Sequence, residues 1–343
     1  MASRKIDVLV AAVSLIVGVS AMMAGCDRGA AYHQHSGFTM GTYYAVTYAG
    51  AARCVGELSE VLEDELDAVN AQMSTYLPDS ELSRFNASNA LDWVDVSIEL
   101  AETIAVALEL SKQSQGAFDV TVGPLVNAWG FGPQERTEPP SAEEVASALA
   151  RVGYDKLMVD VELSALRKRQ VDLYVDLSAI AKGHGVDRLA AVLDRHGCEH
   201  FLVDIGGEVR TRGHNASGSD WRVGIEVPDG SGSIQRVLYL SGLAVATSGD
   251  YRNFRVESGS RISHTIDPRR GRPVEHDLAS VTVVAERAEL ADGYATLISV
   301  LGAESGLRFA RDRDLAVFLI VRQEAGFEER YTAPMTRYLP GLK

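Results

Sequence analysis

Cysteine is scarce in this chain of 343 residues, which has three, at positions 26, 54 and 198. None stands in a motif that would assign its thiol to a metal or to catalysis. Because Cys26 directly follows an N-terminal leader, Cys54 and Cys198 are the cysteines of the body. They could pair in an oxidising compartment, although their spacing does not show whether they do. We therefore expect both to be structural.

Positive charge is scarce as well. The chain has 33 Lys and Arg against 47 Asp and Glu, a formal net charge of -14, and its body contains no Lys/Arg cluster. A nucleic-acid-binding surface needs the opposite sign, so we exclude nucleic acid as a partner. No change of composition between residues 37 and 335 marks a linker. We therefore expect a single domain over residues 37–335 and a short tail over 336–343.

Long apolar runs are missing from the N-terminus. The apolar stretch there covers residues 8–19, which is shorter than the roughly 20 residues that a membrane-spanning helix needs. It follows Arg4 and Lys5 and precedes small residues, an arrangement typical of a secretory signal. We predict a signal peptide over residues 1–25. The alternative is an uncleaved anchor helix.

The end of this leader, Met-Ala-Gly-Cys, resembles the bacterial lipobox, in which the cysteine receives lipid and becomes the first mature residue. We therefore expect Cys26 to anchor the protein in a lipid bilayer and residues 26–36 to form a tether. Asp27 resembles the signal that keeps such lipoproteins on the inner membrane. The predicted location is the periplasmic side of the cell inner membrane.

Helical and strand patterns alternate along the body, which favours an α+β fold in one mixed domain. Ser97 is expected to cap a helix, and Ser141 with Glu144 forms a predicted capping box. The expected helices cover residues 55–73, 97–116, 141–153, 180–196, the region of 289–299, and 303–311. The expected strands lie in residues 38–48, 169–178, 200–207, 221–228, 236–247, 278–286 and 315–322. A helix-then-strand order that recurs in the tail also suggests an internal duplication.

The segment ELADGYATLIS, residues 289–299, combines a helical pattern with an unexpected carboxylate. Asp292 and Thr296 share one helix face because they stand four residues apart. A desolvated carboxylate is costly unless it is paired with a cation. The alternative is that Asp292 caps the helix and Thr296 bonds to the backbone.

A second unusual segment is DLSAIAKGHGVDRL, residues 176–189. A strand is expected to end at Asp176, and the turn that follows brings in Lys182 beside Gly183 and Gly185. Glycines allow a ligand to approach the backbone, and a lysine there suits a phosphate. The alternative is a helix start with Asp176 as its cap and Lys182 in solvent.

Other segments are less specific when each is taken alone. Residues 115–132 are rich in glycine and aromatics and could wall a planar ring, or form a core strand and turn. Tyr76 stands next to a turn, where exposed aromatics are common. His264 lies at a junction of strand and loop, where catalytic groups often gather, although a lone histidine is more often structural.

Together these segments resemble the ApbE family of FAD:protein FMN transferases, bacterial lipoproteins that attach flavin to other proteins. The resemblance covers about residues 37–335. Its segments, in chain order, are MGTYY, MSTYLPDSELSRFN, GAFDVTVGPL, DLSAIAKGHGVDRL, VDIGGEV, ATSGDYRNF, SHTIDPRRGRPV and ELADGYATLIS. The chain departs from the family pattern at His184 and Arg270, which are not among the residues assigned to a ligand.

The resemblance implies a site for FAD and Mg²⁺. It assigns the metal ligands to Asp292, Thr296 and the backbone carbonyl of Ala179, which are oxygen ligands suited to a hard cation. His264 is the candidate general base for the acceptor hydroxyl, with Asp292 as the rival. The residues implied to contact FAD are Met40, Tyr76, Ala117, Phe118, Asp119, Asp176, Lys182 and Ile266.

The implied reaction is Mg²⁺-dependent transfer of FMN from FAD to a Thr or Ser hydroxyl of a target protein, with release of AMP. The implied targets are subunits of membrane redox complexes of the Nqr or Rnf kind. One alternative is a Mg²⁺-dependent FAD pyrophosphatase that gives FMN and AMP; Tyr76 argues against it, because the hydrolytic relatives carry a smaller polar residue there. The other is a non-catalytic FAD-binding lipoprotein, which would need no metal site.

Overall fold

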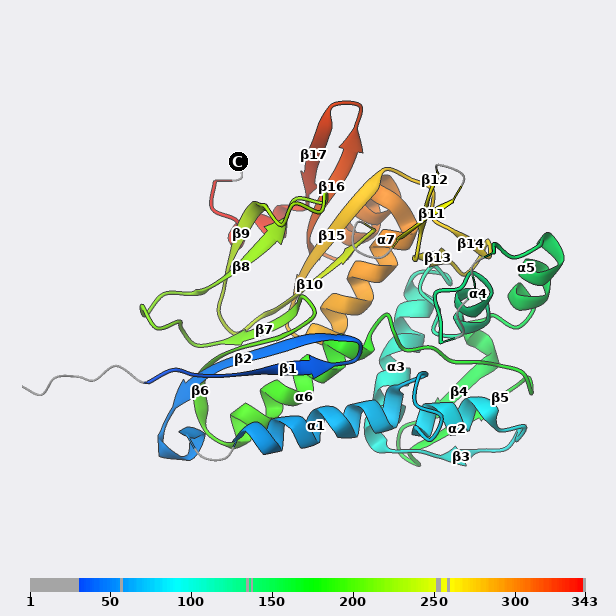
Figure 1. Ribbon diagram of the computed structural model, residues 1–343, viewed down its shortest axis with the longest axis horizontal. Helices are drawn as coiled ribbons and strands as arrows, with labels where there is room; N and C mark the ends of the chain where they lie inside the picture. Colours follow the sequence, from blue (N-terminus) through cyan, green and yellow to red (C-terminus); the bar gives the residue numbers. More distant parts are fainter. Residues whose placement is uncertain are drawn as a thin grey trace, which may run out of the picture.

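The protein is built around a large sheet, seen in a computed structural model that describes residues 31–55, 58–133, 136, 138–250, 254–257 and 260–341. The predicted signal peptide and Cys26 lie outside the described residues. The sheet has eight strands, and all of its pairings are antiparallel (Figure 1). Its strands, from one edge to the other, are β1 (His33–Thr39), β2 (Thr42–Gly50), β6 (Cys198–Ile205), β7 (Glu208–Arg212), β10 (Ala244–Gly249), β15 (Leu278–Ala285), β16 (Ala316–Gln323) and β17 (Gly326–Tyr331).

Helices cover one face of this sheet. Helix α7 packs on β10 and β15, and α6 packs on β6 and β7 and lies against α7. Helix α1 adds a further layer on α6, and α3 contacts α7 (Figure 1). The helices are α1 (Leu58–Met73), α2 (Glu81–Ala87), α3 (Ile98–Gln113), α4 (Gly123–Ala128), α5 (Ala142–Leu149), α6 (Ala181–Arg195) and α7 (Ala288–Arg311).

The opposite face of the sheet is covered by a hairpin of β8 (Trp221–Glu226) and β9 (Ile234–Leu240) and by the short helix η3 (Ala333–Arg337). Ile225 and Leu238 of the hairpin join Val245 and Phe318 of the sheet in one apolar cluster. The remaining elements are short: β3 (Val94–Asp95), β4 (Leu157–Asp160), β5 (Ala165–Lys168), β11 (Phe254–Glu257), β12 (Ser260–Ser263), β13 (Ile266–Asp267), β14 (Arg272–Pro273), η1 (Ala52–Val55) and η2 (Tyr154–Lys156). Mixed helices and antiparallel sheets confirm the α+β prediction, whereas the internal duplication stays a prediction.

Side-chain alternation explains how the sheet is layered. In β2, Tyr44, Val46 and Tyr48 point into the apolar cluster shared with α1 and α6, whereas Tyr43 is exposed. Strand β15 is buried on both faces along almost its whole length, as expected for a strand in the middle of a covered sheet. At the edge formed by β1 and β2, the paired residues Phe38 and Tyr43 are 89% and 44% exposed, so this edge has one open face.

The predicted helix caps are confirmed. The Ser97 side chain accepts from the amide of Leu100 at the start of α3. Ser141 and Glu144 form a capping box at the start of α5. In both cases a serine oxygen satisfies an amide that the first helical turn leaves without a partner.

Other boundaries were predicted wrongly. Residues 38–48 form two strands, because Met40 and Gly41 have φ values of 49° and 73° and turn the chain back on itself. Residues 169–178 do not form a strand: the Val175 amide donates to the Asn86 side chain, and the Asp176 amide donates to the Val120 carbonyl. By contrast, the two helices predicted near 289–299 and 303–311 are confirmed: they are the two parts of α7 on either side of a kink at Gly302, where φ is 76°.

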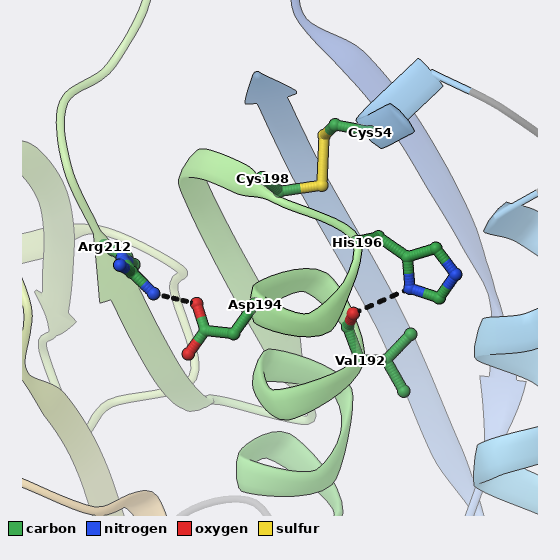
Figure 2. The surroundings of a disulfide bond; sticks show 6 residues. All are labelled: Cys54, Val192, Asp194, His196, Cys198 and Arg212. Carbon is green, nitrogen blue, oxygen red and sulfur yellow. Dashed lines mark hydrogen bonds and ion pairs between the residues drawn. A yellow bond between two sulfur atoms is a disulfide. The ribbon is translucent and has the colours of Figure 1, made fainter. Parts of the chain in front are cut away.

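A disulfide joins Cys54 to Cys198, which the sequence had left open (Figure 2). Both cysteines are buried, and their Cα atoms lie 5.0 Å apart across a separation of 144 residues. The bond ties η1, which follows β2, to the first residue of β6, the next strand in the sheet. Next to it, the His196 ring lies 2.9 Å from the Val192 carbonyl at the end of α6.

In the described part of the chain, no helix is both long enough and apolar enough to cross a membrane.

Replacing both Cys54 and Cys198 with alanine should lower the free energy of unfolding by about 2–5 kcal/mol, because the unfolded chain gains freedom when a long loop is opened. Urea unfolding of the purified protein measures this change. Dithiothreitol should destabilise the wild type by a similar amount and leave the double variant unchanged. An equal response of both proteins to the reductant would contradict the pairing.

Candidate functional site

One cleft of about 1790 Å³ brings together every residue that the sequence assigned to a ligand or to catalysis. It lies where the start of α6 and the first half of α7 meet the turn between β1 and β2 and the segment leading into β13. The assigned residues that line it are Met40, Tyr76, Ala117, Phe118, Asp119, Asp176, Ala179, Lys182, His264, Ile266, Asp292 and Thr296.

Asp292 lies inside α7, whose N-cap residue is Arg287, so the alternative of Asp292 as a helix cap is wrong. Its side chain is buried, and burial raises the pKa of the Asp292 carboxyl above its usual range. One carboxylate oxygen accepts from the Gly183 amide at 3.0 Å, and the other lies 3.9 Å from the Lys182 ammonium. Thr296, one turn further along, also faces the cleft.

The bond from Gly183 to Asp292 leaves another oxygen available. In a regular helix the Gly183 amide would donate to the Ala179 carbonyl, but Ile180 has φ −150° and α6 begins only at Ala181. In the described part of the chain, the Ala179 carbonyl accepts no backbone hydrogen bond, and the Thr296 hydroxyl has no hydrogen-bond partner. These oxygens and the Asp292 carboxylate fit a hard cation such as Mg²⁺.

A cation site here would contain one carboxylate. The residues that the structure describes include no cluster of three or more His, Cys, Asp or Glu side chains that could hold a metal. Such a composition suits Mg²⁺, which keeps several waters and is usually bound through one or two carboxylates together with substrate phosphates.

Glu208 is a site residue that the sequence reasoning missed. Its carboxylate lines the cleft, is buried, and lies 2.7 Å from the Lys182 ammonium. Burial raises its pKa to about 7; Lys182 opposes this shift and Asp292 adds to it. Its second oxygen is buried and has no hydrogen-bond partner among the described residues. The only sequence signal was the segment VDIGGEV, in which Gly206 and Gly207 make the turn before β7.

Asp119 and Asp176 line the cleft and also accept hydrogen bonds from nearby backbone amides. Asp119 accepts from the Thr121 amide and hydroxyl and from the Tyr154 amide, at 2.7–2.8 Å. Asp176 accepts from the Ser178 amide at 2.8 Å and does not cap α6, whose N-cap residue is Ile180. Both carboxylates therefore fix the loops that form the wall of the cleft.

The mouth of the cleft carries aromatic and apolar side chains. Tyr76 is 63% exposed, and its loop is held by the Ser74 hydroxyl, which accepts from the amides of Tyr76 and Leu77. His264 is partly buried, and its ring packs edge-on against Phe131, with 6.5 Å between ring centroids. An imidazole and an exposed phenol thus stand where a second substrate would enter.

The glycines of α6 serve helix packing, and the expectation that they allow a ligand to approach stays a prediction. A Cβ on Gly183 would lie 2.3 Å from the carbonyl oxygen of Ala288 in α7, and one on Gly185 would lie 2.9 Å from the Met40 side chain. The Asp187 carboxylate adds a further tie, because it accepts from the Ala288 and Glu289 amides at 3.0 Å each. The two helix starts are therefore locked together at the site.

His184 stabilises this junction through contacts of its ring with α3 and α7. Its Nδ1 lies 2.9 Å from the Thr103 hydroxyl and 3.5 Å from the Glu289 carboxylate. Burial, helped by the positive charge of Arg188, lowers the pKa of His184 from 6.5 to about 4. The folded protein therefore holds this imidazole neutral over a range in which the unfolded chain protonates it.

The stability of the protein should fall as the pH decreases from 6.5 toward about 4, because the unfolded state binds a proton at His184 that the folded state excludes. Replacing His184 with glutamine keeps a hydrogen-bonding group but removes the titration. The loss of unfolding free energy between pH 7 and pH 4.5 should then be smaller by about 2 kcal/mol. Urea unfolding at both pH values measures it, and equal losses in both proteins would refute the buried neutral imidazole.

Known proteins share this architecture. The ApbE family model matches residues 40–319. The FAD:protein FMN transferase of Haemophilus influenzae is 42% identical over 322 residues, which are 91% of this chain and 93% of that protein. The solved structure of the flavin transferase ApbE from Vibrio cholerae has a TM-score of 0.84 at 40% identity, covering 90% of this chain and 100% of that one. The apo structure of the Pseudomonas stutzeri flavinyl transferase ApbE has a TM-score of 0.83 at 39% identity, covering 90% and 96%. The resemblance seen in the sequence is confirmed: this chain belongs to the ApbE family.

Proposed function

We propose that this protein is an FAD:protein FMN transferase, which moves FMN from FAD to a Thr or Ser hydroxyl of a target protein and releases AMP. The observation that carries the proposal is the junction of α6 and α7. There the Gly183 amide is diverted to Asp292, which leaves the Ala179 carbonyl without a backbone partner. The Thr296 hydroxyl also has no hydrogen-bond partner in the described part of the chain. The transferase names of relatives that match most of the chain add support.

A bound Mg²⁺ would be held by Asp292, Thr296 and the Ala179 carbonyl, and would neutralise charge on the FAD diphosphate as the phosphorus–oxygen bond breaks. Lys182 adds a positive charge at the same place and orients the phosphates through charge-assisted hydrogen bonds. Glu208, at 2.7 Å, holds the Lys182 ammonium in position.

The acceptor hydroxyl attacks the phosphorus of the FMN half, and the oxygen that bridged the diphosphate leaves with AMP. We assign the removal of the hydroxyl proton to His264, which lines the cleft. Asp292 is the weaker candidate, because its carboxylate already accepts from Gly183 and would bind the cation. A positioned base contributes about 10²–10⁴-fold to such a reaction.

The remaining cleft residues would bind FAD. Ala117 and Phe118 are almost fully buried, so they would contact the cofactor through their backbone and ring edge. Met40, Asp119, Asp176 and Ile266 line the same wall. Tyr76 stands at the mouth and, by resemblance, favours transfer over hydrolysis of FAD by water.

We also propose that the enzyme is lipid-anchored through Cys26 on the periplasmic side of the inner membrane, where it would meet flavin-acceptor subunits of Nqr- or Rnf-type redox complexes. The disulfide between Cys54 and Cys198 supports such a location, because structural disulfides persist in oxidising compartments. The lipobox-like sequence before Cys26 supports the anchor.

Mass spectrometry tests the reaction directly. A candidate acceptor subunit of this kind, incubated with the protein, FAD and Mg²⁺, should gain one FMN on a Thr or Ser. EDTA should abolish the gain, and Asp292→Ala should lower the labelling rate by about 10²-fold or more, as expected when charge stabilisation in the transition state is lost.

Asp92→Ala is the matched control, because Asp92 is an exposed aspartate outside the cleft, and this variant should label at the wild-type rate. Release of FMN and AMP without any labelled acceptor would indicate a pyrophosphatase instead. Unchanged FAD in the presence of several acceptors would indicate a flavin-binding lipoprotein.

A further inference from the structure

The cleft continues beyond the residues assigned to FAD and Mg²⁺. Its volume of about 1790 Å³ exceeds the roughly 300–1,000 Å³ of a pocket that holds one small ligand. The additional part, which we name the β8 groove, lies between the open face of the sheet edge and the hairpin of β8 and β9. It is lined by Tyr43, Leu202, Arg222, Val223, Gly224 and Ile234.

Strand β8 turns its edge toward this groove. Residues 222, 223 and 224 are consecutive in β8, so the Val223 side chain points to one face of the hairpin and the Arg222 side chain points to the other. All of them nevertheless line the groove. Consecutive residues of one strand can line the same groove only when the backbone edge between the two faces is turned toward it.

The hydrogen bonds of β9 show which backbone groups lie on that edge. The Tyr239 amide donates to the Tyr338 carbonyl, so it points away from β8. Tyr239 is opposite Arg222, and Val237 is opposite Gly224, two residues further along. In an antiparallel ladder, when one residue turns its N–H and C=O groups outward, the residue opposite it does the same, and this arrangement recurs at every second pair. The amides and carbonyls of Arg222 and Gly224 therefore face the groove, and among the described residues none of these groups has a hydrogen-bond partner.

We infer that the β8 groove binds the acceptor protein, whose segment carrying the reactive Thr or Ser docks in extended form as an added strand on β8. The inference rests on the proposed transferase function. An exposed strand edge is a template for pairing with another chain. Strand addition takes its affinity from main-chain hydrogen bonds and its selectivity from alternate side chains.

The position of the groove supports this occupant. It opens into the same cleft as Lys182, His264 and Asp292, so a segment paired with β8 would enter beside the reacting phosphate. Tyr43 and Ile234, which are 44% and 54% exposed, offer apolar contacts to the side chains on either side of the reactive residue.

Gly224→Pro tests the added strand, because proline removes the outward amide and is tolerated on an edge strand. The probe is the acceptor subunit of the labelling experiment. Its KM should rise about tenfold or more, because the main-chain hydrogen bond to the Gly224 amide is lost; a factor of ten corresponds to roughly 1.4 kcal/mol of binding free energy. The affinity for FAD, followed by flavin fluorescence, should stay within twofold of wild type. Gly224→Ala separates the lost amide from the added bulk: it keeps the amide, its Cβ presses on the end of the Ile234 side chain at 2.7 Å, and its KM for the acceptor should rise less than that of Gly224→Pro.

Amide hydrogen exchange on the unaltered full chain provides a test that does not depend on a variant. A Thr→Ala form of the acceptor, which binds but cannot react, should slow exchange at the amides of Arg222 and Gly224. Labelling of the wild-type acceptor without this protection, and with an unchanged KM for Gly224→Pro, would overturn the docking site while leaving the transferase function intact. Absence of labelling with the wild-type chain would overturn the function, and the docking site with it.

Discussion

The hydrogen bond from the Gly183 amide to the Asp292 carboxylate is the contact on which the site depends. It joins the start of α6 to the interior of α7 at 3.0 Å. It exists because Gly183 has no side chain that would collide with Ala288. Redirecting this amide leaves the Ala179 carbonyl without a helical partner and holds the Asp292 carboxylate in place. One contact therefore prepares two of the groups whose oxygens a cation would use. The tie from Asp187 to the first amides of α7 holds the two helices in that arrangement.

Burial gives the same place its electrostatic character. Glu208 and Asp292 are both buried, and Lys182 lies at 2.7 Å from one and 3.9 Å from the other. A single ammonium does not balance two carboxylates, and uncompensated buried charge is costly. A further cation would relieve that imbalance. The burial that raises the pKa values of both acids therefore also favours binding of a metal ion.

Part of the site could be predicted from the residues themselves, whereas the FAD-contacting residues and the Ala179 carbonyl were assigned only through the family resemblance. The spacing of Asp292 and Thr296 is an example of the first kind. In the fold, the serine caps at residues 97 and 141 could be predicted as well, because a capping serine is a local signal. Glu208 could not be predicted, since a single glutamate at the start of a strand shows no spacing and becomes significant only when the sheet brings it to Lys182. The segment 169–178 was predicted as a strand that leads into a turn. In the structure its backbone amides donate to the Asn86 side chain and the Val120 carbonyl, not to a neighbouring strand. The disulfide also required the fold, because β2 and β6 are neighbours in the sheet but far apart in the chain.

The central claim is that the junction of α6 and α7 holds a cation against the FAD diphosphate. Crystals grown with FAD and Mn²⁺, a substitute for Mg²⁺ with a measurable anomalous signal, test it most directly. The account predicts one strong anomalous peak bound by the Asp292 carboxylate, the Thr296 hydroxyl and the Ala179 carbonyl, in contact with the FAD phosphates. A peak elsewhere, or FAD bound in the cleft with its phosphates away from Lys182 and Asp292, would contradict it.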